Sequence, residues 1–172
     1  MPLVLTMLLG VVLAAVSSAM AIGSATETMI AGSFRDGTAL FYAADAAAEF
    51  AIDELARSDW SDILDTGGRS TFIDGASPRS GMSDATPGYQ VYAYGPFSDM
   101  LHRTARGVDP YVIVWLADLT ESSHAAASER IAGIRAAAFG PAGGRRSVAV
   151  TARLTSSDTG VVVERLSWTE AP

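Results

Sequence analysis

The residue types that most often carry catalysis or bind metal ions are scarce in this sequence of 172 residues. It has no cysteine, which excludes a thiol nucleophile, a zinc–thiolate site and a disulfide framework. Its two histidines, His102 and His124, are too few for a histidine-rich metal site. No serine stands in the Gly-x-Ser-x-Gly pattern of a nucleophile elbow. We therefore expect no enzyme activity, no bound metal and no cofactor.

Two polar stretches have the composition of ligand-binding loops but not the spacing. Residues 143–146 read Gly-Gly-Arg-Arg and lack the Gly-x4-Gly-Lys-Ser/Thr pattern of a phosphate loop, so we expect a hairpin turn over 140–144. Residues 59–89 are rich in Asp, Ser and Gly but lack the EF-hand spacing of Gly and Glu. We expect a short helical turn at 59–65 and an irregular loop at 66–89.

The charge distribution argues against a nucleic-acid partner. The formal net charge is -7, and every basic residue is an arginine. A nucleic-acid surface needs a basic stripe that displaces counterions from phosphates, and no such stripe is present.

The first 25 residues predict a membrane-spanning or filament-core helix. From Pro2 to Ile22 the run is apolar apart from three hydroxyl residues, and about twenty helical residues cross roughly 30 Å of hydrocarbon. The large apolar side chains of this segment are Leu3, Val4, Leu5, Leu8, Leu9, Val11, Val12, Leu13 and Val16.

A cleaved signal peptide is the alternative for the same residues, because Ala19-Met20-Ala21 matches a small-x-small cleavage site. No Lys or Arg precedes the apolar run, which favours a retained helix. We expect that a basic leader once preceded this run and was removed, because export systems read basic residues on the cytoplasmic side.

Residues 26–58 predict an amphipathic continuation of the helix. Apolar residues recur at three- and four-residue spacing, as one helical stripe does. The stripe consists of Leu40, Ala43, Ala44, Ala47, Phe50, Ala51 and Leu55. Asp45, Glu49 and Asp53 lie on another face, where we expect them to be solvated or paired with arginines from elsewhere. Glycines and serines within 17–37 make that stretch the expected place for a bend or a break.

Residues 59–172 predict a globular β-rich domain. Strand-like runs cover 90–94, 111–116, 129–139, 145–154 and 160–169, and the continuous apolar run 111–116 is typical of a strand covered on both faces. Sequential strands favour an antiparallel meander, with the amphipathic helix covering one face. We expect an α+β fold, with Tyr42, Tyr92, Tyr94, Trp115 and Trp168 packed in its core.

Part of the chain resembles a known family. Thr-Glu-Thr-Met-Ile-Ala-Gly-Ser from Thr26 and Phe-Tyr-Ala-Ala-Asp-Ala from Phe41 are similar to a run in the PilX-type (minor) group of type IV pilin-like proteins. The match spans about residues 3–57, including the apolar helix that precedes it. The matching motif residues are Thr26, Glu27, Met29, Ala31, Gly32, Arg35, Asp36, Phe41, Ala43, Ala44 and Asp45.

The resemblance implies a type IV pilin-like fold and a structural role. It implies a single-pass inner-membrane precursor, trimmed by a prepilin peptidase and assembled with copies of itself and other pilins into an extracellular filament. Three features depart from the family. Residues 1–10 contain no acid to match the glutamate of many pilins, the basic leader and its Gly-Phe junction are absent, and no cysteine is available for a C-terminal disulfide.

Two other interpretations remain open. A membrane-anchored binding module that never polymerises would use loop 66–89 or 97–110, with Phe97–Arg103 as its best surface. An exported domain would lose its first 21 residues. Within the pilin-like interpretation, a pilus and a type II secretion pseudopilus, and an abundant and a rare subunit, fit the residues equally.

Overall fold

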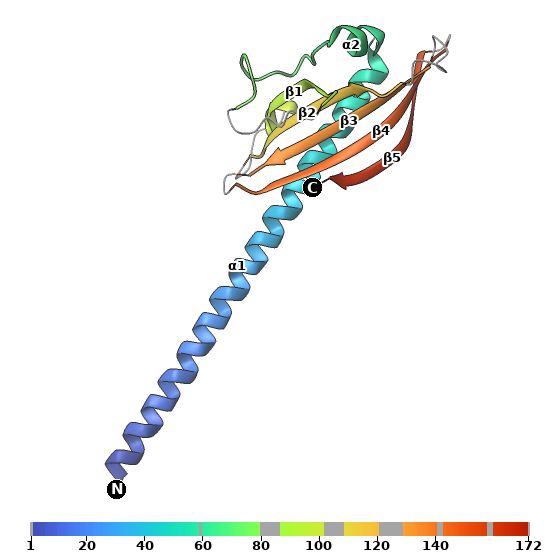
Figure 1. Ribbon diagram of the computed structural model, residues 1–172. Coiled ribbons are helices and arrows are strands. Elements are labelled where there is room, and N and C mark those ends of the chain that lie inside the picture. Colours follow the sequence, from blue (N-terminus) through green and yellow to red (C-terminus); the bar gives the residue numbers. More distant parts are fainter. Residues whose placement is uncertain are drawn as a thin grey trace. The chain divides into compact units, whose positions relative to one another are not determined.

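One long helix and one five-stranded sheet make up most of the described chain (Figure 1). The computed structural model describes residues 2–58, 60–79, 87–101, 109–120, 129–140, 143–157 and 160–171. The helices are α1 (Pro2–Arg57), α2 (Trp60–Thr66) and α3 (Phe97–Met100). The strands are β1 (Gln90–Pro96), β2 (Tyr111–Asp118), β3 (Glu129–Phe139), β4 (Arg145–Ser157) and β5 (Gly160–Ala171). The chain forms two compact units, Met1–Asp36 and Gly37–Pro172.

The sheet is an antiparallel meander in the order β1-β2-β3-β4-β5, as predicted (Figure 1). The five expected strands are confirmed, each within a few residues of its predicted end. The turn between β3 and β4 is also confirmed by the Gly140 amide, which donates to the Gly144 carbonyl over 2.8 Å. Gly143 has a φ of +77°, a backbone conformation that glycine adopts without strain.

The second part of α1 packs on one face of this sheet and forms the main core. Its apolar stripe is buried as predicted, except that Phe50 is only partly buried and Ala48 joins it. Ala44, Ala47, Ala48 and Ala51 have no exposed surface at all. Alanines at these positions let the helix backbone approach the sheet closely, and Val148, Val150 and Leu154 of β4 supply the bulk that fills the interface.

The opposite face of the sheet carries a smaller apolar cluster. Tyr94, Tyr111, Ile113, Trp115 and Ala137 are buried there, while neighbouring residues of β2 face α1. The run 111–116 is therefore covered on both faces, as its composition predicted. The core prediction was wrong for two aromatics, because Tyr42 is 64% exposed on α1 and Trp168 is 38% exposed on β5 at the edge of the sheet.

The helix α1 is continuous through 17–37, so the expected break does not occur. The glycines there each cost about 1 kcal/mol relative to alanine, which the surrounding good helix formers offset. By length and composition α1 is suited to crossing a membrane. The short helix α2 was predicted. Within the predicted loop 66–89, the described residues contain one isolated bridge, Ile73 to Tyr94, and residues 80–86 lie outside the described chain.

Candidate functional site

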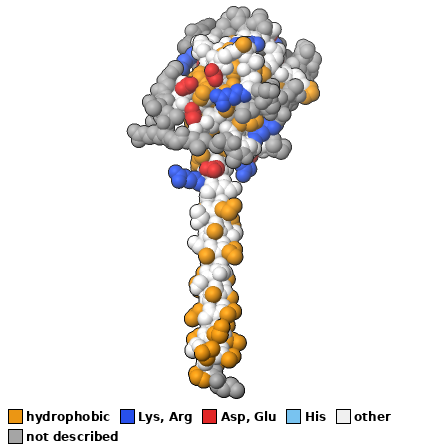
Figure 2. Space-filling view, turned by 90° about the vertical axis from the view of Figure 1, so that its left-hand side faces the viewer, with side chains coloured by type: hydrophobic (Ala, Val, Ile, Leu, Met, Phe, Trp, Pro, Cys, Tyr) orange, Lys and Arg blue, Asp and Glu red, His pale blue; other side chains and the backbone are white. Residues whose placement is uncertain are grey.

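The most distinctive surface is the apolar segment of α1 over residues 2–26. No charged residue precedes Glu27, and every side chain from Pro2 to Asp36 is exposed within its unit. All nine predicted filament-core residues, Leu3, Val4, Leu5, Leu8, Leu9, Val11, Val12, Leu13 and Val16, are exposed by 47–72%. Figure 2 shows hydrophobic side chains along this helix on the face in view. By length and composition such a helix could cross a membrane, and exposed apolar surfaces of this kind are typical of segments that contact lipid or other apolar helices.

Three of the five hydroxyl groups in residues 2–26 are satisfied inside the helix itself. Thr6 donates to the Leu3 carbonyl, Ser18 to Ala14 and Thr26 to Ile22, each over 2.9 Å. Thr28 donates to the Ser24 carbonyl over the same distance. Hydroxyls that bond to the preceding turn need no water, so these residues do not oppose an apolar environment. This feature was not foreseen from the sequence, although the hydroxyls themselves were visible there.

The structure separates the family-motif residues into two groups. Thr26, Glu27, Met29, Ala31, Gly32, Arg35 and Asp36 are exposed in the first unit. Phe41, Ala43, Ala44 and Asp45 belong to the second unit, where Ala43 and Ala44 are buried in the core. The motif is therefore not a single pocket. Its first group is exposed within the first unit, and in its second group Ala43 and Ala44 pack α1 on the sheet.

Three side-chain contacts join α1 to the edge strand β5. The indole Nε1 of Trp168 donates to the Asp45 carboxylate over 2.9 Å. The Trp168 ring stands edge-to-face against Phe41 at 5.8 Å, and Arg165 forms an ion pair with Glu49. The expected arginine partner of the acidic face is thus confirmed for Glu49, while Asp53 pairs with Arg57 on the same helix.

A polar cluster fastens the end of α1 to the segment after α2. The Glu54 carboxylate accepts hydrogen bonds from the hydroxyls of Ser70 and Thr71. Burial raises the pKa of Tyr92, and the negative charge of Glu54 and a hydrogen bond to it raise that pKa further. The hydroxyl of Tyr92 is therefore held in its neutral form beside the carboxylate. We interpret this cluster as structural.

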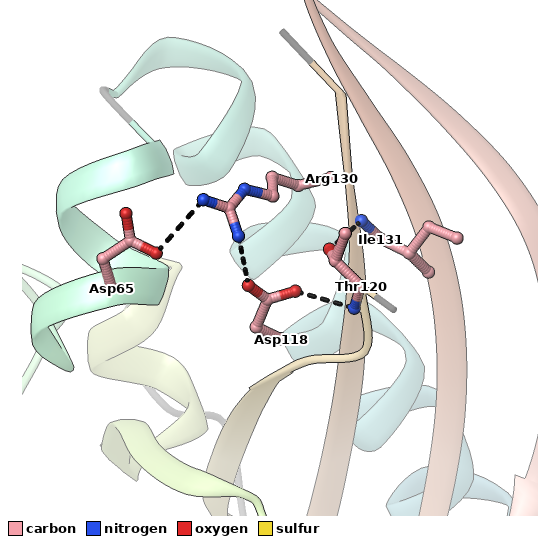
Figure 3. A network of polar contacts seen from close by, with 5 residues as sticks. All are labelled: Asp65, Asp118, Thr120, Arg130 and Ile131. Atoms are coloured by element: carbon pink, nitrogen blue, oxygen red, sulfur yellow. Dashed lines mark hydrogen bonds and ion pairs between the residues drawn. The ribbon is translucent and has the colours of Figure 1, made fainter. Parts of the chain in front are cut away.

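A second network links α2 with the ends of β2 and β3 (Figure 3). Arg130 contacts the Asp118 carboxylate at 2.9 Å and the Asp65 carboxylate at 3.6 Å. Asp118 also accepts from the Thr120 amide, and the Thr120 hydroxyl accepts from the Ile131 amide. These contacts hold together the end of β2 and the start of β3, on either side of the connection between them. We therefore assign Arg130 a structural role.

A hollow of about 160 Å³ lies beside this network. It is lined by Ile63, Leu64, Gln90, Tyr92, Leu116 and Asp118, among others. Pockets for small organic ligands are commonly 300–1,000 Å³, on the order of two to six times larger. Its volume corresponds to a small water cluster. Its acid, Asp118, is already paired with Arg130.

The described part of the predicted binding surface Phe97–Arg103, residues 97–101, is more buried than expected. Phe97–Met100 forms the short helix α3, Met100 is buried, and Phe97 packs partly buried against the core. α3 directly follows the edge strand β1, and its apolar side chains are packed into the core, which the local sequence does not reveal. Residues 102–108, which include His102 and Arg103, lie outside the described residues, as does His124.

No arrangement for metal chemistry is found in the part of the chain that the structure describes. Among those residues, no group of three or more His, Asp or Glu side chains lies together in a way that could hold an ion. Gly143, Gly144 and Arg145 belong to the hairpin and the start of β4, with the Arg145 guanidinium over the Phe139 ring at 5.6 Å.

Comparison with known proteins adds no relative to this description. Neither a protein-family model, nor a curated protein, nor a solved structure matches the chain. The functional proposal therefore depends on the motif residues and on the surface of α1.

Proposed function

We propose that this chain is a structural, non-enzymatic subunit of a type IV pilus or of the related type II secretion pseudopilus. Before assembly it is a single-pass protein of the inner membrane. After assembly it is part of an extracellular filament that serves adhesion, motility or secretion. Its partners are copies of itself, other pilins, the assembly machinery and a prepilin peptidase.

The observation that carries the proposal is the surface of α1 over residues 2–26. It is apolar on all sides, uncharged and exposed, and the hydroxyls of Thr6, Ser18 and Thr26 bond to the helix backbone. A helix of this kind leaves lipid without a large penalty only when another apolar environment receives it. A bundle of identical helices provides that environment, which is the core of a pilin-like filament.

The second part of α1 supports the same proposal. Residues 40–55 contribute seven buried side chains to the core of the globular unit. The apolar segment and the domain core thus lie on one continuous helix, Pro2–Arg57. A subunit built this way carries its domain wherever its helix is packed, as a pilin-like α+β architecture requires.

The test is removal of residues 1–25 from the chain, compared with the full chain in cells that assemble filaments. We expect the full chain in sheared surface fibres, identified by mass spectrometry. The shortened chain is expected to be a soluble monomer, measured by light scattering, because its assembly surface is gone.

Two outcomes would contradict the proposal. Filaments formed by the shortened chain would show that α1 does not drive assembly. A full chain that stays entirely in the membrane fraction after shearing would instead support a membrane-anchored module that does not polymerise.

A further inference from the structure

Glu27 and Arg35 are two opposite charges in the unit Met1–Asp36 that have no partner among the residues that the structure describes. Both are exposed, and Asp36 is the only other charged residue in the unit Met1–Asp36. The positions three and four residues from Glu27 hold Ser24, Gly23, Ile30 and Ala31, none of which can pair with it. Within the described chain, neither Glu27 nor Arg35 makes an ion pair or a side-chain hydrogen bond.

The two charges cannot meet within one helix. Eight residues separate them, which places them about 12 Å apart along the axis and about 80° apart around it. Ala31, Gly32 and Ser33 are the small residues between them, whereas Met29, Ile30 and Phe34 are large and exposed. A Cβ added at Gly32 would meet nothing within 4 Å. A second helix can therefore approach closely over Ala31 and Gly32.

We propose that Arg35 of one copy pairs with Glu27 of the next, with the two α1 helices parallel and staggered by eight residues. This inference rests on the proposed function, because it names the contact between neighbouring subunits. Charge complementarity selects the partner as a second copy of this chain. Copies inserted from the same side of a membrane are parallel, so an antiparallel pairing is excluded.

Other staggers leave Glu27 without a cation. In register, Glu27 would face a second Glu27 and be repelled. A one-residue stagger would join Arg35 to Asp36 and leave Glu27 beside uncharged residues. The next cation on α1 is Arg57, which already pairs with Asp53 and would require an offset of about 45 Å. A carboxylate removed from water without a partner is costly, so the eight-residue stagger is preferred.

The geometry of this contact allows it to repeat from one copy to the next. Each copy offers Glu27 to one neighbour and Arg35 to another, so the contact is heterologous rather than two-fold symmetric. A heterologous contact that does not close into a ring generates an open helical filament. The same two residues thereby set a rise of about 12 Å between contacting copies.

Charge reversal in the full chain tests the pairing. We expect Arg35→Glu alone and Glu27→Arg alone to lose most of the filament recovered by shearing. The double variant Glu27→Arg with Arg35→Glu restores the pair in reverse and should recover it. The matched comparison is Asp36→Arg with Arg35→Glu, which should not recover it. Rescue through Asp36 instead of Glu27, or failure of the Glu27 double variant, would overturn the proposed contact.

The absence of native cysteine allows an independent test. Glu27→Cys and Arg35→Cys chains, produced together and oxidised, should form a disulfide-linked pair of copies. Glu27→Cys alone should not, because its two Cα atoms would be offset by about 12 Å, beyond the roughly 7 Å limit for a disulfide. A link between two residues 27 would overturn the stagger.

Mixtures of two chains, each with one cysteine at a different position of residues 3–25, separate this inference from the proposed function. If some of these mixtures link copies while the 27–35 pair does not, helix assembly stands and the stagger is wrong. If no mixture links copies, both the assembly role and the stagger are wrong.

Discussion

At the scale of single residues, Trp168 shows how one side chain joins distant parts of the chain. It contacts Phe41 with its ring and donates its indole hydrogen to Asp45, 123 residues earlier. Both partners lie on α1, and Trp168 lies on the edge strand β5. Its partial exposure therefore reflects a position at the border of the core and not a free surface aromatic.

Trp168→Phe tests the indole hydrogen bond separately from the ring contact. The substitution keeps an aromatic ring near Phe41 and leaves the Asp45 carboxylate without its donor. We expect a loss of about 1 kcal/mol in the free energy of unfolding. Urea unfolding of the full chain in detergent, followed by near-ultraviolet circular dichroism, measures it. An unchanged midpoint would show that water replaces the bond without cost.

Tyr92 makes stability depend on alkaline pH. Its pKa in the folded chain is raised by burial and then by Glu54, whereas in the unfolded chain the hydroxyl ionises near pH 10. The unfolded state therefore releases the proton first, so stability is complete below about pH 10 and falls as the pH rises above it. We expect Tyr92→Phe to reduce this fall, measured by unfolding midpoints between pH 8 and 11.

The control for that measurement is Tyr42→Phe, which removes a tyrosine hydroxyl from the exposed side of α1. If both variants change the alkaline slope equally, the environment of Tyr92 is not its cause.

At the scale of elements, the alanine face of α1 decides how closely the helix approaches the sheet. Ala47 has no exposed surface and lies in the main core. Ala47→Leu should overpack this interface and destabilise the globular unit by about 1–3 kcal/mol. Ala39→Leu adds the same volume at an exposed position of α1 and should be nearly neutral. Thermal unfolding of the two variants compares them, and equal melting temperatures would contradict close helix–sheet packing.

At the scale of the whole molecule, the apolar segment should determine where the protein resides. A charge near the middle of a membrane-spanning helix costs about 3 kcal/mol. Val12→Asp is therefore expected to reduce the protein in the membrane fraction. Val162→Asp places the same charge at an exposed valine of β5 and should leave that fraction unchanged. Quantitative blotting after membrane sedimentation measures both, and equal retention would argue against membrane insertion through residues 2–26.

The sequence alone determined the features that depend on local periodicity. Apolar side chains at helical spacing predicted the buried face of α1, and alternating or continuous apolar runs predicted the five strands and their order. The uncharged run before Glu27 predicted the exposed apolar segment. These features are local because a helix or strand shows its buried face in a short window of residues.

Only the tertiary structure decided which distant residues meet. The Trp168–Asp45 bond, the Glu54 cluster and the burial of Met100 depend on contacts between distant segments. The sequence alone does not show which of the possible contacts between such segments form. The same limit explains the error for Tyr42, whose aromatic type suggested the core while its place on the helix left it exposed. Which distant side chains meet depends on the strand order and on the register of each strand pair. These contacts therefore stabilise the fold only once the sheet has assembled.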